Sequence, residues 1–328
     1  MVYGKKKICV SRKGNGIKMN KPLVSYVVTT YNIEKYVEES VRCAFEQTYS
    51  PLEIVLSDDC STDSTFEIME RMAKEYTGPH KIVLNRNKKN LGITKHMNKA
   101  YLELATGEII VVAHGDDISD SNRTQVLVDY LSKHSECMQV ACSAIVVDEN
   151  LVPYSDFLQK NCWVSEERIY EFGSGAHVSV GFSAFRRKVM EFFGPLGDLC
   201  PTEDDPIGFR AIILGNIAYL PNKLVKYRKH AGSNSNPEQF ARFPLDEIYN
   251  QNLRDMELAK SKGIIDSTKI EREKKRLFKA KEFRKVYRIY FANRTLKSLI
   301  KVVTYKGLTI KTRIYYIREH LEYLRTGN

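Results

Sequence analysis

Four short apolar runs alternate with segments of helical periodicity over the first third of the chain. Each run is rich in β-branched residues, as expected of a strand that is buried on both faces. Strands that alternate with helices form parallel sheets, because a crossover must connect each strand to the next. The pattern therefore predicts an α/β fold with a doubly wound, mostly parallel sheet flanked by helices. The four runs are 23–30, 53–57, 81–85 and 109–113.

Polar clusters follow three of these runs, at the points where the predicted strands end. The carboxyl ends of parallel strands meet at one edge of a sheet, and ligands bind at that edge in open α/β folds. We therefore expect the three clusters to converge on one binding site. They are Thr29–Asn32, Asp58–Asp59 and Asp116–Asp117.

Asp116 and Asp117 are adjacent carboxylates that repel each other at the end of an apolar strand. A divalent cation with hard oxygen ligands, Mg²⁺ or Mn²⁺, would stabilise them if it were shared with a diphosphate. The alternative is that Asp117 or Ser119 caps the helix that follows. The sequence contains neither a Gly-x-Gly-x-x-Gly loop nor a Gly-x-x-x-x-Gly-Lys loop, so phosphate must be neutralised in another way.

The pattern loosens in the second half of the chain. Strands are expected at 138–147 and 220–227, with a mixed loop region over 150–200 between them. Asp205 is expected to cap a helix that begins at Pro206. The chain is helical and basic from about residue 245 onward. The expected parts are a flexible basic tail at 1–21, an α/β domain at 22–245 and a helical C-terminal extension at 246–328.

Positive charge is concentrated at the two ends of the chain. Residues 1–21 hold seven Lys and Arg and no acid, and residues 260–328 hold twenty Lys and Arg against six Asp and Glu. The formal net charge is +11, so the central part is acidic. Nucleic-acid enzymes usually carry basic residues around the central cleft. Basic ends instead favour an anionic membrane surface as a partner, and we expect no nucleic acid.

The C-terminal extension also carries an apolar stripe accompanied by Arg313, Arg318 and Arg325. The stripe favours peripheral membrane binding, and the alternative is that it packs within the protein. No apolar run is long enough to span a bilayer, and the seven cysteines include no Cys-x-x-Cys pair. We therefore expect a cytoplasmic protein, peripheral on the inner face of the membrane. The stripe consists of Ile314, Ile317, Leu321 and Leu324.

The polar clusters belong to longer motifs, and the order of these motifs is informative. With them, residues 22–235 resemble the family 2 glycosyltransferases, which are inverting nucleotide-sugar enzymes of the GT-A fold. Each motif is weak singly, and their order gives the resemblance its strength. The motifs are Val24–Asn32, Gln47–Tyr49, Glu53–Thr65, Asn90–Gly92, Gly107–Asp117, Glu203–Asp204 and Tyr227–His230.

The resemblance implies that the first clusters hold the nucleotide, through Thr29, Tyr31, Asp59 and Asn90. The chemistry agrees for two of them. An Asp carboxylate can accept a hydrogen bond from the N3–H of uracil, and a Tyr ring offers a stacking face. The alternative for Asp59 is a cap of the helix that follows, and its neighbour Asp58 is expected to be structural.

The resemblance also implies roles for the later motifs. Asp116 and Asp117 match the acidic motif that binds Mn²⁺ or Mg²⁺. Glu203 and Asp204 match the acidic pair that includes the catalytic base, which we assign to Asp204. A loop that closes over the diphosphate would contain Arg228 and His230. The alternative for His230 is a strand-end histidine that bonds to the backbone.

Three residues depart from the family pattern. His114 stands where many members have Asp, so the metal must rest on the pair that follows it. Met97 stands where many members have Arg, which removes one contact. Thr29 replaces the more frequent Pro. The departures leave the proposed base unaffected.

The implied activity is transfer of a sugar, with inversion, from a nucleotide-sugar donor to an acceptor hydroxyl. A UDP-sugar is the expected donor, and the acceptor is a carbohydrate or a lipid-linked molecule in polysaccharide or glycolipid assembly. One alternative is a metal-dependent nucleotidyltransferase, which would be expected to carry a glycine-rich basic loop after the first strand. The other is a non-catalytic basic protein that binds a membrane or nucleic acid.

Overall fold

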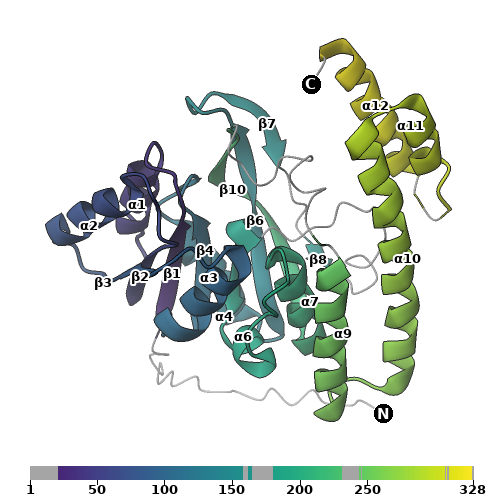
Figure 1. Ribbon diagram of the computed structural model, residues 1–328. Coiled ribbons are helices and arrows are strands. Elements are labelled where there is room, and N and C mark those ends of the chain that lie inside the picture. Colours follow the sequence, from purple (N-terminus) through teal and green to yellow (C-terminus); the bar gives the residue numbers. More distant parts are fainter. Residues whose placement is uncertain are drawn as a thin grey trace, which may run out of the picture.

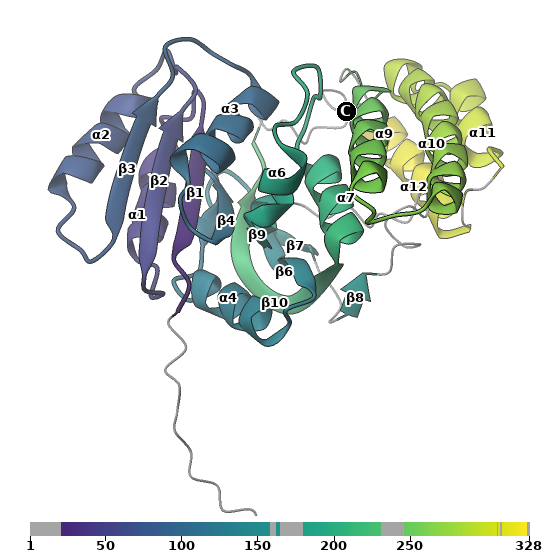
Figure 2. The same ribbon diagram turned by 90° about the horizontal axis from the view of Figure 1, so that it is seen from below.

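The protein is a broad sheet covered by helices on both faces, with a group of long helices at one side (Figures 1 and 2). The first 20 residues of the predicted basic tail lie outside the part of the chain that is described. No helix in that part is long and apolar enough to cross a membrane. The computed structural model describes residues 21–157, 162–164, 180–230, 244, 246–306, 308 and 310–326.

The first part of the chain alternates strands and helices, which confirms the prediction. The helical segment between the third and fourth strands is an α-helix continued by a π-helical turn, η1. The elements are β1 (Val24–Thr30), α1 (Val37–Phe45), β2 (Leu52–Asp58), α2 (Thr65–Glu75), β3 (Lys81–Arg86), α3 (Ile93–Lys99), η1 (Ala100–Leu104), β4 (Ile109–His114), β5 (Ile118–Ser119) and α4 (Arg123–Lys133).

The second part contains the two predicted strands, β6 and β10, and β10 begins four residues earlier than expected. The region 150–200 is more regular than predicted, since it includes three strands and a helix among its described residues. The elements are β6 (Cys137–Val147), β7 (Pro153–Phe157), β8 (Cys162–Val164), η2 (Val180–Phe182), β9 (Ser183–Arg186), α6 (Lys188–Phe193), α7 (Asp204–Leu214), β10 (Asn216–Arg228), α9 (Asp246–Ser261), α10 (Ser267–Asn293), α11 (Leu296–Val303) and α12 (Ile310–Thr326).

The strands form one sheet in the order β3-β2-β1-β4-β9-β6-β10-β5, with β7 on β6 and β8 on β10. β1 pairs in parallel with β2 on one side and with β4 on the other. The chain therefore reverses its direction of winding between β1 and β4, and such a switch point leaves a crevice at the carboxyl ends of the strands. β9 is antiparallel to both of its neighbours, so the sheet is mixed at this point.

Side chains of the central strands alternate between two apolar layers. Val27, Val55 and Val112 face the layer that contains residues of α3, α6 and α7. Tyr26 and Val28 face the layer formed with α1, α2 and α4. Every residue of β1 and β2 is buried, as expected of strands covered on both faces.

The prediction that Asp205 caps a helix starting at Pro206 is wrong. α7 begins at Asp204, because the carbonyl of Glu203 already accepts from the N–H of Ile207 at 2.9 Å. Asp205 is therefore the second residue of the helix. Asp204 and Asp205 both lie in the first turn, where the positive end of the helix dipole stabilises carboxylates.

A buried ion pair joins the C-terminal extension to the α/β part. Nε and Nη2 of Arg210, in α7, donate to the two carboxylate oxygens of Asp255, in α9, at 2.8 and 3.0 Å. Both side chains are almost fully buried. Apolar residues of α7 and α9 surround the pair in one cluster, so α9 is packed as part of this core. The division of the chain at residues 245 and 246 remains a prediction.

We expect Asp255→Ala to destabilise the protein by about 3–5 kcal/mol, because it leaves the Arg210 charge buried without its partner. Glu75→Ala is the control, since it breaks an ion pair between exposed side chains, with Arg71. That change should cost less than about 1 kcal/mol. Urea unfolding of the two variants measures the difference, and equal losses would contradict the assigned importance of the buried pair.

Candidate active site

The turn after β4 brings the acidic pair against the end of β1. The N–H of Gly115 donates to the carbonyl of Thr29 at 3.0 Å. A Cβ at Gly115 would lie 2.4 Å from Ile33 and 2.6 Å from Thr30, so a side chain there would push the two loops apart. Glycine therefore allows Asp116 and Asp117 to enter the switch-point crevice.

Asp117 is a buried carboxylate with one oxygen bonded and one free. Oδ1 accepts from the backbone N–H of Arg228 at 2.9 Å. Oδ2 is buried and has no hydrogen-bond partner among the described residues. Burial, and then the charge of Asp116, raise the pKa of Asp117 well above its usual value. The capping alternative is contradicted for this residue, because α4 begins only at Arg123.

Asp116 is paired with His230, a contact that the sequence analysis did not predict. Nε2 of His230 lies 3.1 Å from Oδ2 of Asp116. Burial alone would raise the pKa of Asp116, but the hydrogen bond from His230 and the nearby His114 outweigh it, so that this pKa is lowered. The imidazole thus contacts a carboxylate.

Arg228 closes the side of the site formed by α1. Its buried guanidinium donates from Nη2 to Glu39 at 2.5 Å and lies 4.6 Å from the ring centroid of Tyr36. The same ring lies 4.8 Å from that of His230. The structure therefore brings Asp116, Asp117, Arg228 and His230 into one cluster.

Arg123 lies beside the acidic pair, and the sequence analysis did not single it out. Its side chain is almost fully buried, and Nη2 donates to the carbonyls of Val112 and Gly181 at 2.7 and 2.8 Å. Nη1 donates to Oγ of Ser119 at 2.9 Å, so this hydroxyl joins a network rather than capping α4. The guanidinium supplies positive charge beneath Asp117, which partly offsets the rise in its pKa.

The residues assigned to the nucleotide surround the neighbouring strand ends. Asp59 Oδ1 accepts from the side chain of Asn87 at 2.8 Å and from the N–H of Leu91 at 2.9 Å. Its Oδ2 accepts from the N–H of Gly92 at 2.9 Å. Asp59 therefore holds the loop before α3 and does not cap α2. Asn90 lies on this loop and is exposed.

The other residues of this half have different surroundings. Thr29 is buried, whereas the ring of Tyr31 is 46% exposed and available for stacking. Asp58 is fully buried and accepts from both the N–H and the hydroxyl of Ser61, which agrees with its predicted structural role. Met97 belongs to the apolar core on the α3 side of the sheet.

Glu203 and Asp204, the pair expected to include the catalytic base, are two carboxylates in different environments. Glu203 is buried, and burial raises its pKa. Asp204 is only half-buried. The segment before them is fixed to α3, since Thr94 Oγ1 donates to the carbonyl of Cys200 at 2.5 Å. α7 also contacts η2, where Gly181 lies against the ring of His114.

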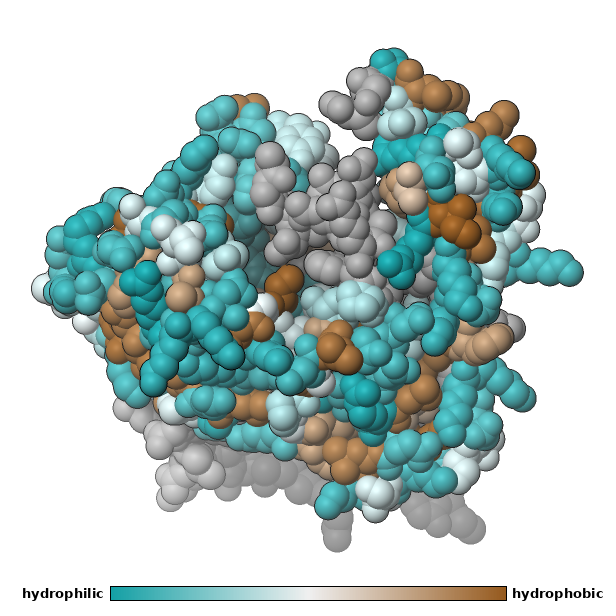
Figure 3. Space-filling model, viewed as in Figure 1, coloured by the Kyte–Doolittle hydropathy of each residue, from teal (hydrophilic) through white to brown (hydrophobic). Residues whose placement is uncertain are grey.

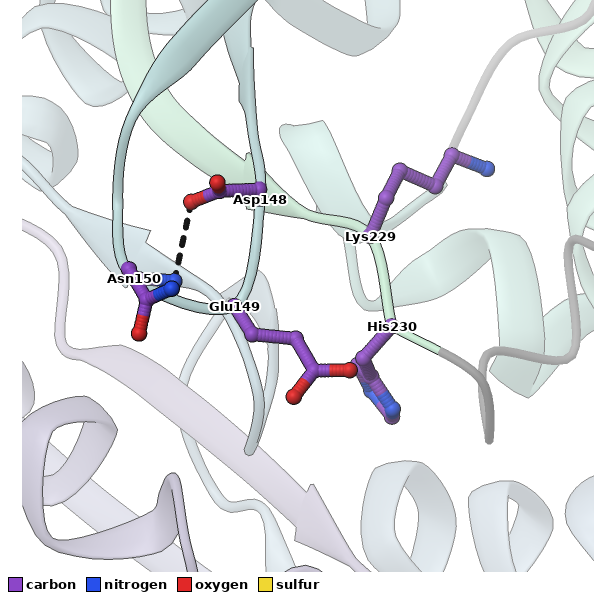
Figure 4. Close-up of a pocket in the computed structure, with 5 residues that line it drawn as sticks. All are labelled: Asp148, Glu149, Asn150, Lys229 and His230. Carbon is purple, nitrogen blue, oxygen red and sulfur yellow. Dashed lines mark hydrogen bonds between the residues drawn. The ribbon is translucent and has the colours of Figure 1, made fainter.

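An open pocket of about 470 Å³ adjoins the cluster. It lies between the loop Asp148–Asn150 and the end of β10, and the Glu149 carboxylate points toward His230 (Figure 4). Burial lowers the pKa of Lys229, against the influence of the acidic pair beside it. The sequence analysis assigned no role to residues 148–150, which form a short turn without a recognisable motif.

The cluster fits a divalent cation in part. Asp116 and Asp117 offer hard oxygen ligands, and Oδ2 of Asp117 has no hydrogen-bond partner among the described residues. Within the described residues, no group of three or more His, Cys, Asp and Glu side chains could hold a metal ion. A cation here would therefore take its other ligands from a bound diphosphate or from water.

Comparisons with known proteins identify the family of this chain. The family described as Glycosyl transferase family 2 matches residues 25–193. An uncharacterised glycosyltransferase of Haemophilus influenzae is 26% identical over 317 residues, which cover 92% of this chain and 93% of that protein. EpsE of Bacillus subtilis is 34% identical over 128 residues, or 39% of this chain and 45% of EpsE. The chain belongs to glycosyl transferase family 2.

Solved structures show the same fold. TarS of S. aureus, in complex with UDP-GlcNAc, aligns with a TM-score of 0.60 and 18% identity over 93% of this chain and 92% of that one. The mannosyltransferase PcManGT of Pyrobaculum calidifontis, in complex with GDP-Man and Mn²⁺, aligns with a TM-score of 0.56 and 19% identity over 94% and 89%. The predicted α/β architecture with C-terminal helices is confirmed.

We expect Mn²⁺ together with UDP to raise the melting temperature of the protein more than UDP does alone, because a cation held by Asp116 and Asp117 would offset their negative charge and add positive charge beside the diphosphate. Asp117→Asn should abolish the added increase while leaving the fold intact. Asp129→Asn, on the exposed surface of α4, is the matched control and should behave like the native protein. An undiminished Mn²⁺ effect in Asp117→Asn would exclude this residue as a ligand.

Proposed function

We propose that the protein is an inverting glycosyltransferase that moves a sugar from a UDP-sugar to the hydroxyl of a carbohydrate or lipid-linked acceptor. The main support is the cluster at the switch point, where a half-satisfied buried carboxylate lies beside Asp116, His230 and Arg228. Such a cluster suits a diphosphate leaving group. Membership of the family favours a transferase over a nucleotidyltransferase or a non-catalytic binding protein.

The nucleotide would bind over β1 and β2. The exposed ring of Tyr31 would stack on the base, and Asp59 Oδ2, which accepts one hydrogen bond in the structure, would accept another from the N3–H of uracil. Thr29 and Asn90 would border the ribose and the base. TarS, one of the similar structures, binds UDP-GlcNAc, and this agrees with the proposed uracil nucleotide.

The chemical step would be a single displacement at the anomeric carbon. Asp204 accepts the proton of the acceptor hydroxyl while the hydroxyl oxygen attacks the anomeric carbon from the face opposite the diphosphate. The bond from the anomeric carbon to the diphosphate breaks, and the configuration at that carbon inverts. His230 and Arg228 face the leaving group and stabilise its growing charge. A divalent cation bound by Asp116 and Asp117 would supply further positive charge to the diphosphate.

The choice of Asp204 over Glu203 rests on their surroundings. Glu203 is only 3% exposed, which leaves its carboxylate little access to an acceptor hydroxyl. Asp204 is half-buried in the first turn of α7, where the helix dipole favours the ionised form. Glu203 would instead position the loop that carries the acceptor. We also propose that the acceptor belongs to polysaccharide or glycolipid assembly on the cytoplasmic side of a membrane.

We expect Asp204→Asn to lower turnover about 100-fold or more, because it removes the proton acceptor and keeps the shape of the side chain. UDP binding should be nearly unchanged, since the base contacts the acceptor. Glu203→Gln is the matched control and should lose less activity. Turnover near the native rate in Asp204→Asn, with loss in Glu203→Gln, would assign the base to the other carboxylate.

The nucleotide can be tested without an acceptor. UDP at about one hundred times its dissociation constant should stabilise the fold by about 2.7 kcal/mol, and Asp59→Asn should weaken this effect. A panel of UDP-, GDP- and dTDP-sugars, compared by thermal shift and slow donor hydrolysis, identifies the donor. A larger shift with GDP than with UDP would overturn the proposed uracil site.

A further inference from the structure

The last three helices form a small bundle that uses one face of α12. A separate apolar cluster joins α10, α11 and α12, and α12 contributes Tyr316 to it. His320 is also buried, with Nδ1 3.3 Å from the hydroxyl of Tyr290 in α10. Arg313 donates to carbonyls at the end of α11, including that of Tyr305 at 3.0 Å. α12 therefore packs against the other two helices of the bundle with the face that carries Arg313, Tyr316 and His320.

The neighbouring face of α12 is apolar and exposed. Its residues follow one another at alternating intervals of four and three, which places them in one line along an α-helix. They are the four residues of the predicted stripe together with Ile310. All five side chains are exposed, whereas the alternative required them to be packed within the protein. The α12 stripe is Ile310, Ile314, Ile317, Leu321 and Leu324, with exposed fractions of 77%, 46%, 42%, 60% and 66%.

Basic side chains border the α12 stripe. At about 100° per residue, Arg318 and Arg325 lie along the edge that faces solvent, while Arg313 lies along the edge that faces the bundle. The two acids of the helix, Glu319 and Glu322, lie more than about 100° from the centre of the stripe. The stripe is therefore an apolar band with positive charge at its solvent edge.

α11 repeats this arrangement on a smaller scale. Leu296 and Ile300 are one turn apart and are 64% and 51% exposed. Lys297 directly follows Leu296 and Lys301 directly follows Ile300, so the two lysines lie along the same edge of the apolar pair. Brown, hydrophobic residues are visible along the outer margin of the molecule over α11 and α12 (Figure 3).

We propose that the α12 stripe docks on the surface of an anionic lipid bilayer, with its apolar side chains in the acyl boundary and Arg318 and Arg325 at the headgroups. A helix that lies in the interface needs this combination of an apolar face and basic edges. Residues 260–328 carry twenty basic against six acidic residues, so the whole extension is attracted to negative lipids.

A second copy of the chain is the competing occupant, because alternating intervals of three and four also suit a coiled-coil seam. The charges oppose it. A seam between two copies needs acids beside the stripe to pair with bases of the partner, and the charged residues beside the α12 stripe are Arg318, Arg325 and Arg313. Like charges would meet across the seam, whereas an anionic bilayer complements them.

Sedimentation of the full chain with lipid vesicles tests the proposal. We expect it to pellet with vesicles of phosphatidylcholine and phosphatidylglycerol, and much less with phosphatidylcholine alone. Salt at about 1 M, where the Debye length falls to ~3 Å, should weaken binding. Leu321→Ser/Leu324→Ser should lower the partition coefficient roughly tenfold or more, and Arg318→Glu/Arg325→Glu should reduce binding to anionic vesicles.

The matched control is Val152→Ser/Ile264→Ser, which removes two similarly exposed apolar side chains outside α12 and should bind vesicles like the native chain. Melting temperatures show whether each variant is folded. Native protein that stays in solution with anionic vesicles, or equal pelleting of the stripe variant, overturns the proposal. The proposal is also overturned if the native protein is a dimer, the Leu321→Ser/Leu324→Ser variant is a monomer, and neither protein binds vesicles. Because no donor, metal or acceptor is present, these results are independent of the proposed transferase activity.

Discussion

The hydrogen bond from the N–H of Arg228 to Asp117 holds the two halves of the site together. The acid follows β4 and the arginine ends β10, so the bond joins residues 111 positions apart in sequence. It uses one carboxylate oxygen and leaves the other free, while Gly115 keeps the turn close to β1. The positions of His230 beside Asp116 and of the Arg228 side chain beside Tyr36 follow from the same contact, because all of them extend from these two strand ends.

The part of the fold that was predictable from sequence is the part with local signals. The first four strands are short apolar runs, of which β1 and β2 are fully buried and β3 is only partly buried, and the intervening helices have regular apolar spacing, so periodicity was sufficient. β5 has two residues and β9 has four, too few for an alternating pattern to appear. The start of α7 was misplaced because Pro206 suggested a first helical position, whereas the hydrogen-bond ladder begins at Glu203.

The same distinction holds for the candidate site. Acidic residues at predicted strand ends could be located because strand polarity fixes where they gather, and Asp116, Asp117, Arg228 and His230 do lie together. Arg123 could not be recognised, since its partners are carbonyls of Val112 and Gly181 that become neighbours only in the folded sheet. The prediction for Asp59 was also incomplete. Its contacts with the loop before α3 are made with backbone N–H groups, so they depend on backbone conformation rather than residue type.

The long helix α10 has a mechanical consequence. Its 27 residues span about 40 Å as a single rigid rod, with α9 packed on the α/β part near one end and α11 and α12 packed at the other. A protein held at the far end of such a rod would keep its active site at a fixed height and tilt above the plane that holds it. The length of α10 would then help to set the distance between that plane and the α/β part.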